Sequence, residues 1–218
     1  MLIYRKIAHY FVLFFIVLSL TACQSAYYSA MEKVGVHKRD IMLDRVEDAK
    51  ESQQEAQQQF KSALEQLSEL IHFDGGELAQ QYELINDQYE ASKAAADDVT
   101  KRIEKIEEVA EALFDEWQDE IGQYSSAKLK RQSELKLKQT QRRYQALIKT
   151  MYRAESKMEP VLAALKDNAL YLKHNLNAQA IGALQGEYGS IKRDVESLVK
   201  EMNIAIEQSQ QFIDLLQP

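Results

Sequence analysis

Residues 96–117 read ADDVTKRIEKIEEVAEALFDEW, and the spacing of their apolar side chains decides the fold. These side chains recur at alternating steps of three and four, at Ala96, Val99, Ile103, Ile106, Ala110, Leu113 and Trp117. Steps of three and four place side chains along one face of an α-helix, and a strict seven-residue repeat favours left-handed supercoiling with other helices. The stretch therefore predicts a long helix in a coiled coil or helical bundle.

The same spacing continues unbroken through four segments of the chain. It runs from Met42 to Leu70, from Leu78 to Trp117, from Leu137 to Leu172 and from Ile181 to Leu216, and we call the residues on it the seam positions. Helix-breaking residues fall between these segments, which predicts helices at roughly 37–73, 77–121, 126–174 and 178–216. Helices joined by such short loops are normally antiparallel neighbours. We therefore expect an all-α fold, an elongated antiparallel bundle or coiled coil of about four long helices.

Two residues refine this expectation. Pro160 lies inside the third segment and cannot donate a hydrogen bond to the preceding turn, so it predicts a kink or a local restart of that helix. Asn177 precedes the fourth segment and is well placed to cap it, because its side chain can accept hydrogen bonds from the first free amides.

The N-terminal residues have the pattern of an export signal. Arg5 and Lys6 precede an apolar run from Ile7 to Leu20, which is shorter than the ~20 residues of an ordinary transmembrane helix. The run ends in LTAC at residues 20–23, which looks like a bacterial lipobox, and Cys23 is the only cysteine in the chain. An uncut signal anchor, or a buried cysteine that acts as a small hydrophobic residue, are the weaker alternatives.

This pattern predicts a division of the chain into three parts. Residues 1–22 would be a lipoprotein signal peptide, residues 23–36 the lipidated Cys23 with a short tether, and residues 37–218 a single elongated helical domain. Gln24 follows Cys23, and the absence of an aspartate there favours the outer membrane, with the rod facing the periplasm. Without residues 1–22 the chain has a net charge of −9, which argues against general binding of nucleic acids.

A short tether places the start of the first helix near the bilayer. In an antiparallel bundle, the turn at residues 122–126 and the C-terminus lie at that same end, and the turns at 75–76 and 175–177 lie at the distal end. Residues 126–143 carry seven basic side chains and one acidic side chain. This predicts a membrane-facing basic patch, and its principal members are Lys128, Lys130, Arg131, Lys136 and Lys138.

An intramolecular role for the basic stretch is the favoured alternative. Residues 104–120 carry eight acidic side chains and one basic side chain, and an antiparallel hairpin would lay this acidic stretch beside the basic one. Flanking charges of this kind fix the partner and the register in coiled coils.

Motifs for catalysis are absent from the sequence. It contains no glycine-rich phosphate loop, no G-x-S-x-G, no C-x-x-C and no H-E-x-x-H. His72 and His174 could approach each other at the distal end, but a histidine near a helix C-terminus is ordinarily a cap residue. We therefore predict no enzymatic activity, no catalytic residues, no metal and no cofactor, and a metal-dependent enzyme stays a remote alternative.

Three stretches resemble a family of Gram-negative bacterial lipoproteins, the domain-of-unknown-function family 2959. They are YYSAMEKVGVHKRDIMLDRVEDAKESQQEAQQQFKSALEQ (27–66), KMEPVLAALKDNALYLKHNLNAQAIGAL (157–184) and DVESLVKEM (194–202). The resemblance implies a bacterial envelope protein with a helical body, and it implies no catalytic residues.

These observations predict a structural or interaction protein of the cell envelope. It would be anchored in the membrane through the lipid on Cys23 and would present its rod to an envelope protein partner. A membrane-binding or membrane-remodelling module is the alternative, because of the basic stretch. Coiled-coil seams can also be completed by a second chain, so a homo-oligomer stays open.

Overall fold

The structure is a computed structural model that describes residues 27–28, 30–73, 75 and 78–217. It contains four long helices, α2 (Lys38–Ile71), α3 (Leu78–Gln123), α4 (Ala127–His174) and α5 (Ala178–Leu216). Residues 27–28 and 30–33 are also helical, and no strand occurs among the residues described. The ends of the four helices lie within two residues of those predicted from the sequence.

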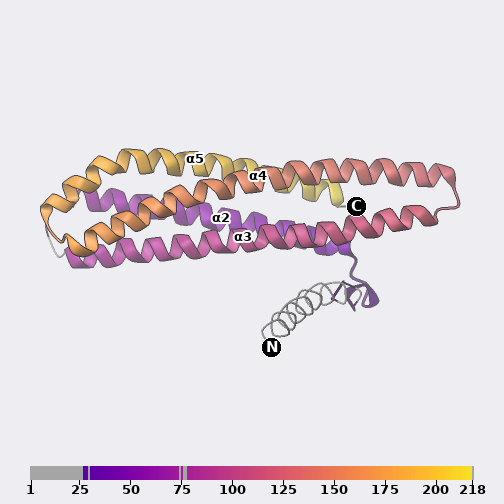
Figure 1. Cartoon of the computed structure of the whole chain (residues 1–218), viewed down its shortest axis with the longest axis horizontal. Helices are drawn as coiled ribbons and strands as arrows, with labels where there is room; N and C mark the ends of the chain where they lie inside the picture. Colours follow the sequence, from indigo (N-terminus) through magenta and orange to yellow (C-terminus); the bar gives the residue numbers. More distant parts are fainter. Residues whose placement is uncertain (1–26, 29, 74, 76–77, 218) are drawn as a thin grey trace, which may run out of the picture.

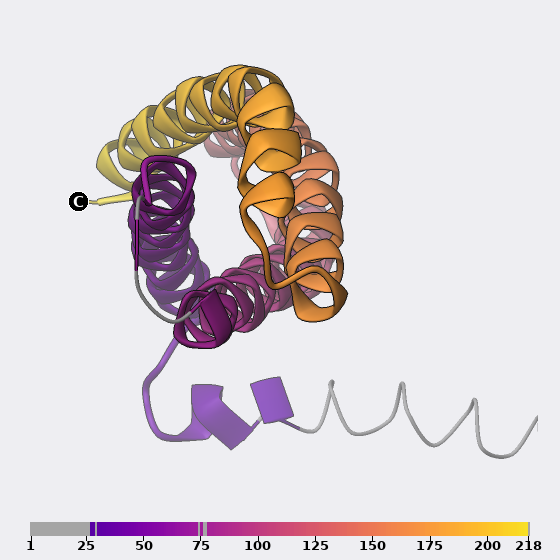
Figure 2. The same ribbon diagram turned by 90° about the vertical axis from the view of Figure 1, so that its left-hand side faces the viewer.

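The four helices surround a common core as an antiparallel bundle (Figures 1 and 2). Helix α2 packs against α3 and α5, and α4 packs against the same two helices. The start of α2, the α3–α4 turn and the end of α5 lie towards one end of the rod, and the α4–α5 turn lies at the other (Figure 1). The predicted all-α antiparallel bundle is confirmed.

The seam positions form the core of this bundle, because every one of them is buried or half-buried. Among the largest side chains that are fully enclosed are Phe60, Ile103, Met151 and Leu165. The half-buried seam positions are mostly aromatic, namely Tyr82, Tyr89, Trp117, Tyr144 and Tyr188. A large ring with a polar end can pack its body in the seam and keep that end near water.

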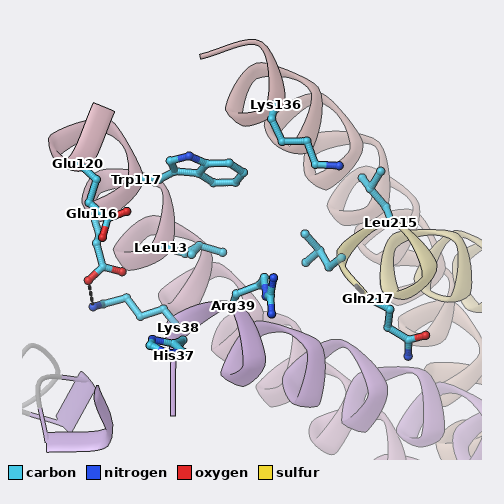
Figure 3. Close-up of a pocket in the computed structure, with 11 residues that line it drawn as sticks. His37, Lys38, Arg39, Leu113, Glu116, Trp117, Glu120, Lys136, Leu215 and Gln217 are labelled. Carbon is cyan, nitrogen blue, oxygen red and sulfur yellow. Dashed lines mark hydrogen bonds and ion pairs between the residues drawn. The ribbon is translucent and has the colours of Figure 1, made fainter. Parts of the chain in front are cut away.

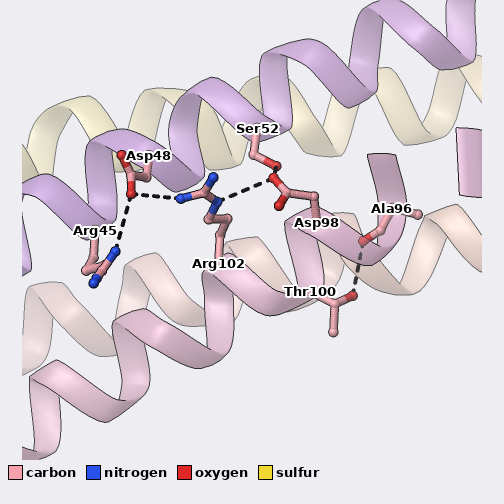
Figure 4. Close-up of polar contacts among 7 residues, drawn as sticks. All are labelled: Arg45, Asp48, Ser52, Ala96, Asp98, Thr100 and Arg102. Carbon is pink, nitrogen blue, oxygen red and sulfur yellow. Dashed lines mark hydrogen bonds and ion pairs between the residues drawn. The ribbon is translucent and has the colours of Figure 1, made fainter. Parts of the chain in front are cut away.

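Polar contacts along the edge of the bundle set the register of α2 against α3 (Figure 4). Arg102 donates to Asp48 at 2.8 Å, and Ser52 donates to Asp98 at 2.8 Å. Arg102 also approaches Asp98 at 3.4 Å, so one guanidinium connects two carboxylates on neighbouring helices. These contacts fix the position of α2 along the axis of α3.

Helix α4 runs unbroken through Pro160, so the predicted local restart does not occur. The proline is exposed, whereas Met158 and Val161 beside it are almost completely buried. Core packing on both sides therefore holds the helix together where one backbone hydrogen bond is lost. Asn177 caps α5 as predicted, since its side chain accepts from the amides of Gln179 and Ala180 at 3.0 and 3.2 Å.

Helices α3 and α4, with 46 and 48 residues, are longer than α2 and α5, with 34 and 39. The α3–α4 hairpin therefore extends past the start of α2 and the end of α5 (Figure 1). We call residues 117–136 the hairpin tip. The last seven residues of α3 belong to the hairpin tip. At a rise of 1.5 Å per residue, they extend roughly 10 Å beyond the four-helix core.

Candidate interaction surfaces

The five predicted membrane-facing cations lie on or beside the hairpin tip. Lys128, Arg131, Lys136 and Lys138 are exposed, and Lys130 is half-buried. No ion pair joins any of them to a carboxylate in the part of the chain that the structure describes. Residues 104–120 and 126–143 do lie side by side, since Trp117 donates to Ser133, but no ion pair joins the two stretches among the described residues.

Three contacts between α3 and α4 define the register of the hairpin. Trp117 of α3 donates to Ser133 of α4 at 2.8 Å. Farther from the turn, the rings of Phe114 and Tyr144 pack edge to face with their centroids 5.4 Å apart. Glu107 accepts a hydrogen bond from Tyr152 at 2.6 Å. Glu107 thus lies level with Tyr152, beyond the basic stretch, whereas Trp117 lies level with Ser133 inside it, so the acidic and basic stretches overlap only in part.

The same carboxylates affect the tyrosines that they face. Burial, helped by the negative charges of Glu107 and Glu111, raises the pKa of Tyr144 to about 12. The hydrogen bond to Glu107, followed by burial, raises the pKa of Tyr152 to about 12. The acidic stretch therefore acts on tyrosines of α4, and the cations near the turn stay available to other anions.

Apolar side chains are also exposed on the hairpin tip. Tyr124, Leu129 and Leu135 are 43%, 51% and 63% exposed, whereas Ile121 packs inside the hairpin at 1%. Leu135 lies on the outer side of α4 between two of the cations, Arg131 and Lys138. Large apolar groups surrounded by cations match the chemistry of an anionic lipid surface.

At the base of the tip, a charged network joins three segments of the chain. Lys38 at the start of α2 contacts Glu32, and it donates to Glu116 of α3 at 2.8 Å. Burial disfavours the charged ammonium, but the hydrogen bonds to Glu116 and Glu32 outweigh it and raise the pKa of Lys38. Burial raises the pKa of Glu116, and the hydrogen bond from Lys38 lowers that of Glu32. The network ties residues 30–33 to the bundle.

Three large apolar side chains are also exposed at the opposite end of the rod. Leu170, Tyr171 and Leu176 are 48%, 41% and 46% exposed, and we call these three residues the distal patch. They lie around the last turn of α4 and the connection to α5. Large apolar side chains gathered on a surface mark a site of interaction more often than isolated ones do.

The histidines considered as metal ligands lie in ordinary surroundings. The Nδ1 atom of His72 lies 2.6 Å from the carbonyl oxygen of Ser68, and the residue caps the end of α2. His174 is exposed at the end of α4. Among the described residues, no group of three or more histidine, cysteine, aspartate or glutamate side chains could hold a metal ion.

Two predictions concern residues that the structure does not describe. The signal peptide at residues 1–22 and the lipidation site Cys23 lie outside the described ranges, so both stay predictions from the sequence. Within the described ranges, no helix has the length and apolar character needed to cross a bilayer.

The fold defines the class of this protein as an antiparallel four-helix bundle whose central hairpin protrudes at one end. Residues 27–216 match the family model described as protein of unknown function (DUF2959), so the chain belongs to that family. No curated protein and no solved structure matches the chain.

The density of basic residues at 128–138 was enough to identify these cations from the sequence. The sequence analysis did not predict that the hairpin tip protrudes. A signal for it was present, since the predicted first and fourth helices are shorter than the third. The distal patch was also missed, because its residues are ordinary helix formers without a motif.

Proposed function

We propose that this protein is a non-enzymatic lipoprotein of the outer membrane whose rod projects into the periplasm and binds another envelope protein. The observation that carries the proposal is the lipobox-like LTAC at residues 20–23, followed by an uninterrupted helical bundle. A lipid on Cys23 would hold the start of α2 near the bilayer. The distal patch, at the other end of the rod, would then face away from the membrane.

Anchoring is tested by replacing Cys23 with Ser. Mass spectrometry of the purified wild-type protein is expected to find a cleaved N-terminus at Cys23 that carries acyl chains. The Cys23→Ser variant should leave the outer-membrane fraction. An unmodified Cys23, or unchanged fractionation of the variant, would contradict the anchor.

Partner binding is tested by photo-cross-linking in cells from the distal patch. Leu170 and Leu176 are each replaced by a photo-reactive residue, and Gln145, exposed midway along α4, serves as the matched control position. We expect the distal positions to capture the same envelope protein and Gln145 to capture none. If neither distal position captures an envelope protein, the interaction role fails.

A second candidate function is contact with anionic lipid through the hairpin tip. The observation that favours it is that Lys128, Lys130 and Arg131 form no ion pair among the described residues and lie near exposed leucines. Vesicles that contain phosphatidylglycerol should bind residues 24–218 more tightly than vesicles of phosphatidylcholine.

Charge reversal on one helix decides this second candidate. Changing Lys128, Lys130 and Arg131 to Glu should abolish the preference for phosphatidylglycerol. Changing Lys149, Lys157 and Lys166 to Glu makes the same change in net charge at exposed positions of α4 outside the tip. Equal loss of binding in the two triple variants would reveal only a general charge effect, and would remove the assignment to the tip.

A further inference from the structure

A cavity opens where the four-helix core ends and the hairpin tip begins. Its volume is about 420 Å³, and the start of α2, the end of α5 and the adjoining turns of α3 and α4 surround it. Small-molecule sites usually measure ~300–1,000 Å³. The cavity exists because α2 and α5 stop at this level while α3 and α4 continue, so that the inner face of the hairpin is uncovered on one side.

Four of the residues that line this cavity are apolar or aromatic, and the others are polar or charged. Leu113 of α3 and Leu216 of α5 are 7% and 5% exposed and end the core at this level, and both line the cavity. Trp117 and Leu215 are half-buried and complete the surface. The indole ring is held in place, since its Nε1 donates to Ser133 at 2.8 Å. Figure 3 shows the ring directed towards the space between the helices.

Some of the charged side chains around the opening of the cavity form ion pairs, and others do not. Glu116 is turned towards Lys38, which it meets at 2.8 Å (Figure 3). Arg39 and Lys136 come from different sides and point towards the same space (Figure 3). Among the described residues, Lys136 has no ion pair, and Arg39 has only a 3.5 Å contact with the half-buried Asp40. The one other acid in the lining is the exposed Glu120.

We propose that this cavity binds a fatty acid, a single-chain amphiphile with a carboxylate head. The acyl chain lies against Leu113, Trp117 and Leu216, and the carboxylate meets Arg39 and Lys136. Charge complementarity selects the head group, because a guanidinium and an ammonium form strong charge-assisted hydrogen bonds with a carboxylate. This site depends neither on a protein partner at the distal patch nor on contact between the hairpin tip and a bilayer.

Trp117 provides the test, because it is the only tryptophan in the chain. The full chain is reconstituted in vesicles of phosphatidylcholine, and its fluorescence is followed during titration with 9,10-dibromostearate, whose bromine atoms quench on contact. We expect saturable quenching that excess unbrominated stearate reverses. The methyl ester of the same acid partitions into the bilayer but has no negative charge, and it should quench far more weakly.

Variants assign the quenching to the cavity. Arg39→Gln and Lys136→Gln should each raise the half-saturating concentration about 5- to 10-fold, as the loss of one charge-assisted hydrogen bond implies. Leu215→Glu places a carboxylate in the wall and should abolish saturation. Lys128→Gln is the matched control, because it removes one cation from the tip outside the cavity lining.

Several outcomes would overturn the proposal. Quenching that does not saturate, or that is equal for the acid and its ester, would show simple partition into the bilayer. An effect of Lys128→Gln as large as that of Arg39→Gln would show general attraction to the tip. Failure of stearate to restore the emission of the wild-type chain would exclude the site even if a variant does not fold.

Discussion

Replacement of Gln53 by Met is expected to stabilise the bundle. Gln53 is a seam position of α2 with 0% exposure, and within the described part of the chain neither its amide nitrogen nor its amide oxygen has a hydrogen-bond partner. Mutational data put the cost of burying an unpaired polar group at about 1–3 kcal/mol. Methionine has nearly the same length and shape without polar atoms, so it removes that cost and leaves no cavity.

The magnitude follows from these terms. The free energy of unfolding should rise by about 1–3 kcal/mol, which corresponds to about 2–4 °C in Tm for each kcal/mol in a protein of this size. Urea unfolding followed by circular dichroism at 222 nm measures the change. Gln54→Met is the matched control, since Gln54 is exposed and a surface change of this kind should stay within about 0.5 kcal/mol.

A loss of stability in the Gln53 variant would contradict this account. If Gln53→Met lowers the free energy of unfolding by more than about 1 kcal/mol while Gln54→Met does not, the amide of Gln53 makes favourable hydrogen bonds in solution. An internal water would be the partner, and the core at this level would be hydrated. Gln53→Met would then remove a satisfied polar group.

Four further predictions follow from particular contacts. Pro160→Ala restores a backbone hydrogen bond at an exposed position and should raise the free energy of unfolding by about 1–3 kcal/mol in the same urea experiment; an unchanged midpoint would contradict this. Neutralising Lys128, Lys130 and Arg131 to Gln should change the free energy of unfolding by less than about 0.5 kcal/mol, whereas a large loss would show that these cations pair within the chain. The hydrogen bond from Ser52 lowers the pKa of Asp98, so its contribution to stability is complete above the ordinary pKa of 3.8 and is lost as the pH falls towards the lowered value. Ser52→Ala should therefore flatten the dependence of the urea midpoint on pH below about pH 4. Glu107→Gln should bring the pKa of Tyr152 down from about 12, as followed by NMR of labelled tyrosine, and an unmoved pKa would assign the shift to burial.

The four long helices, and the side of each helix that is buried, were predictable from the amino-acid pattern. The seam positions from Met42 to Leu216 are local consequences of a seven-residue repeat, and each helix must bury its apolar stripe whatever its neighbours are. The cap at Asn177 was predictable for a similar reason, because it involves only a side chain and the next few amides.

Contacts between helices depend on how far each helix is shifted along its neighbours, and the heptad pattern does not specify this shift. The heptad pattern repeats every seven residues and allows several registers, so it could not show that Glu107 meets Tyr152 or that Arg131 forms no ion pair with the described carboxylates. It also could not show that Pro160 is tolerated, because packing of Met158 and Val161 provides the compensation. The cavity beside Trp117 also depends on the tertiary structure, because it arises where α2 and α5 end and α3 and α4 continue. The two cations that face it, Arg39 and Lys136, are far apart in the chain.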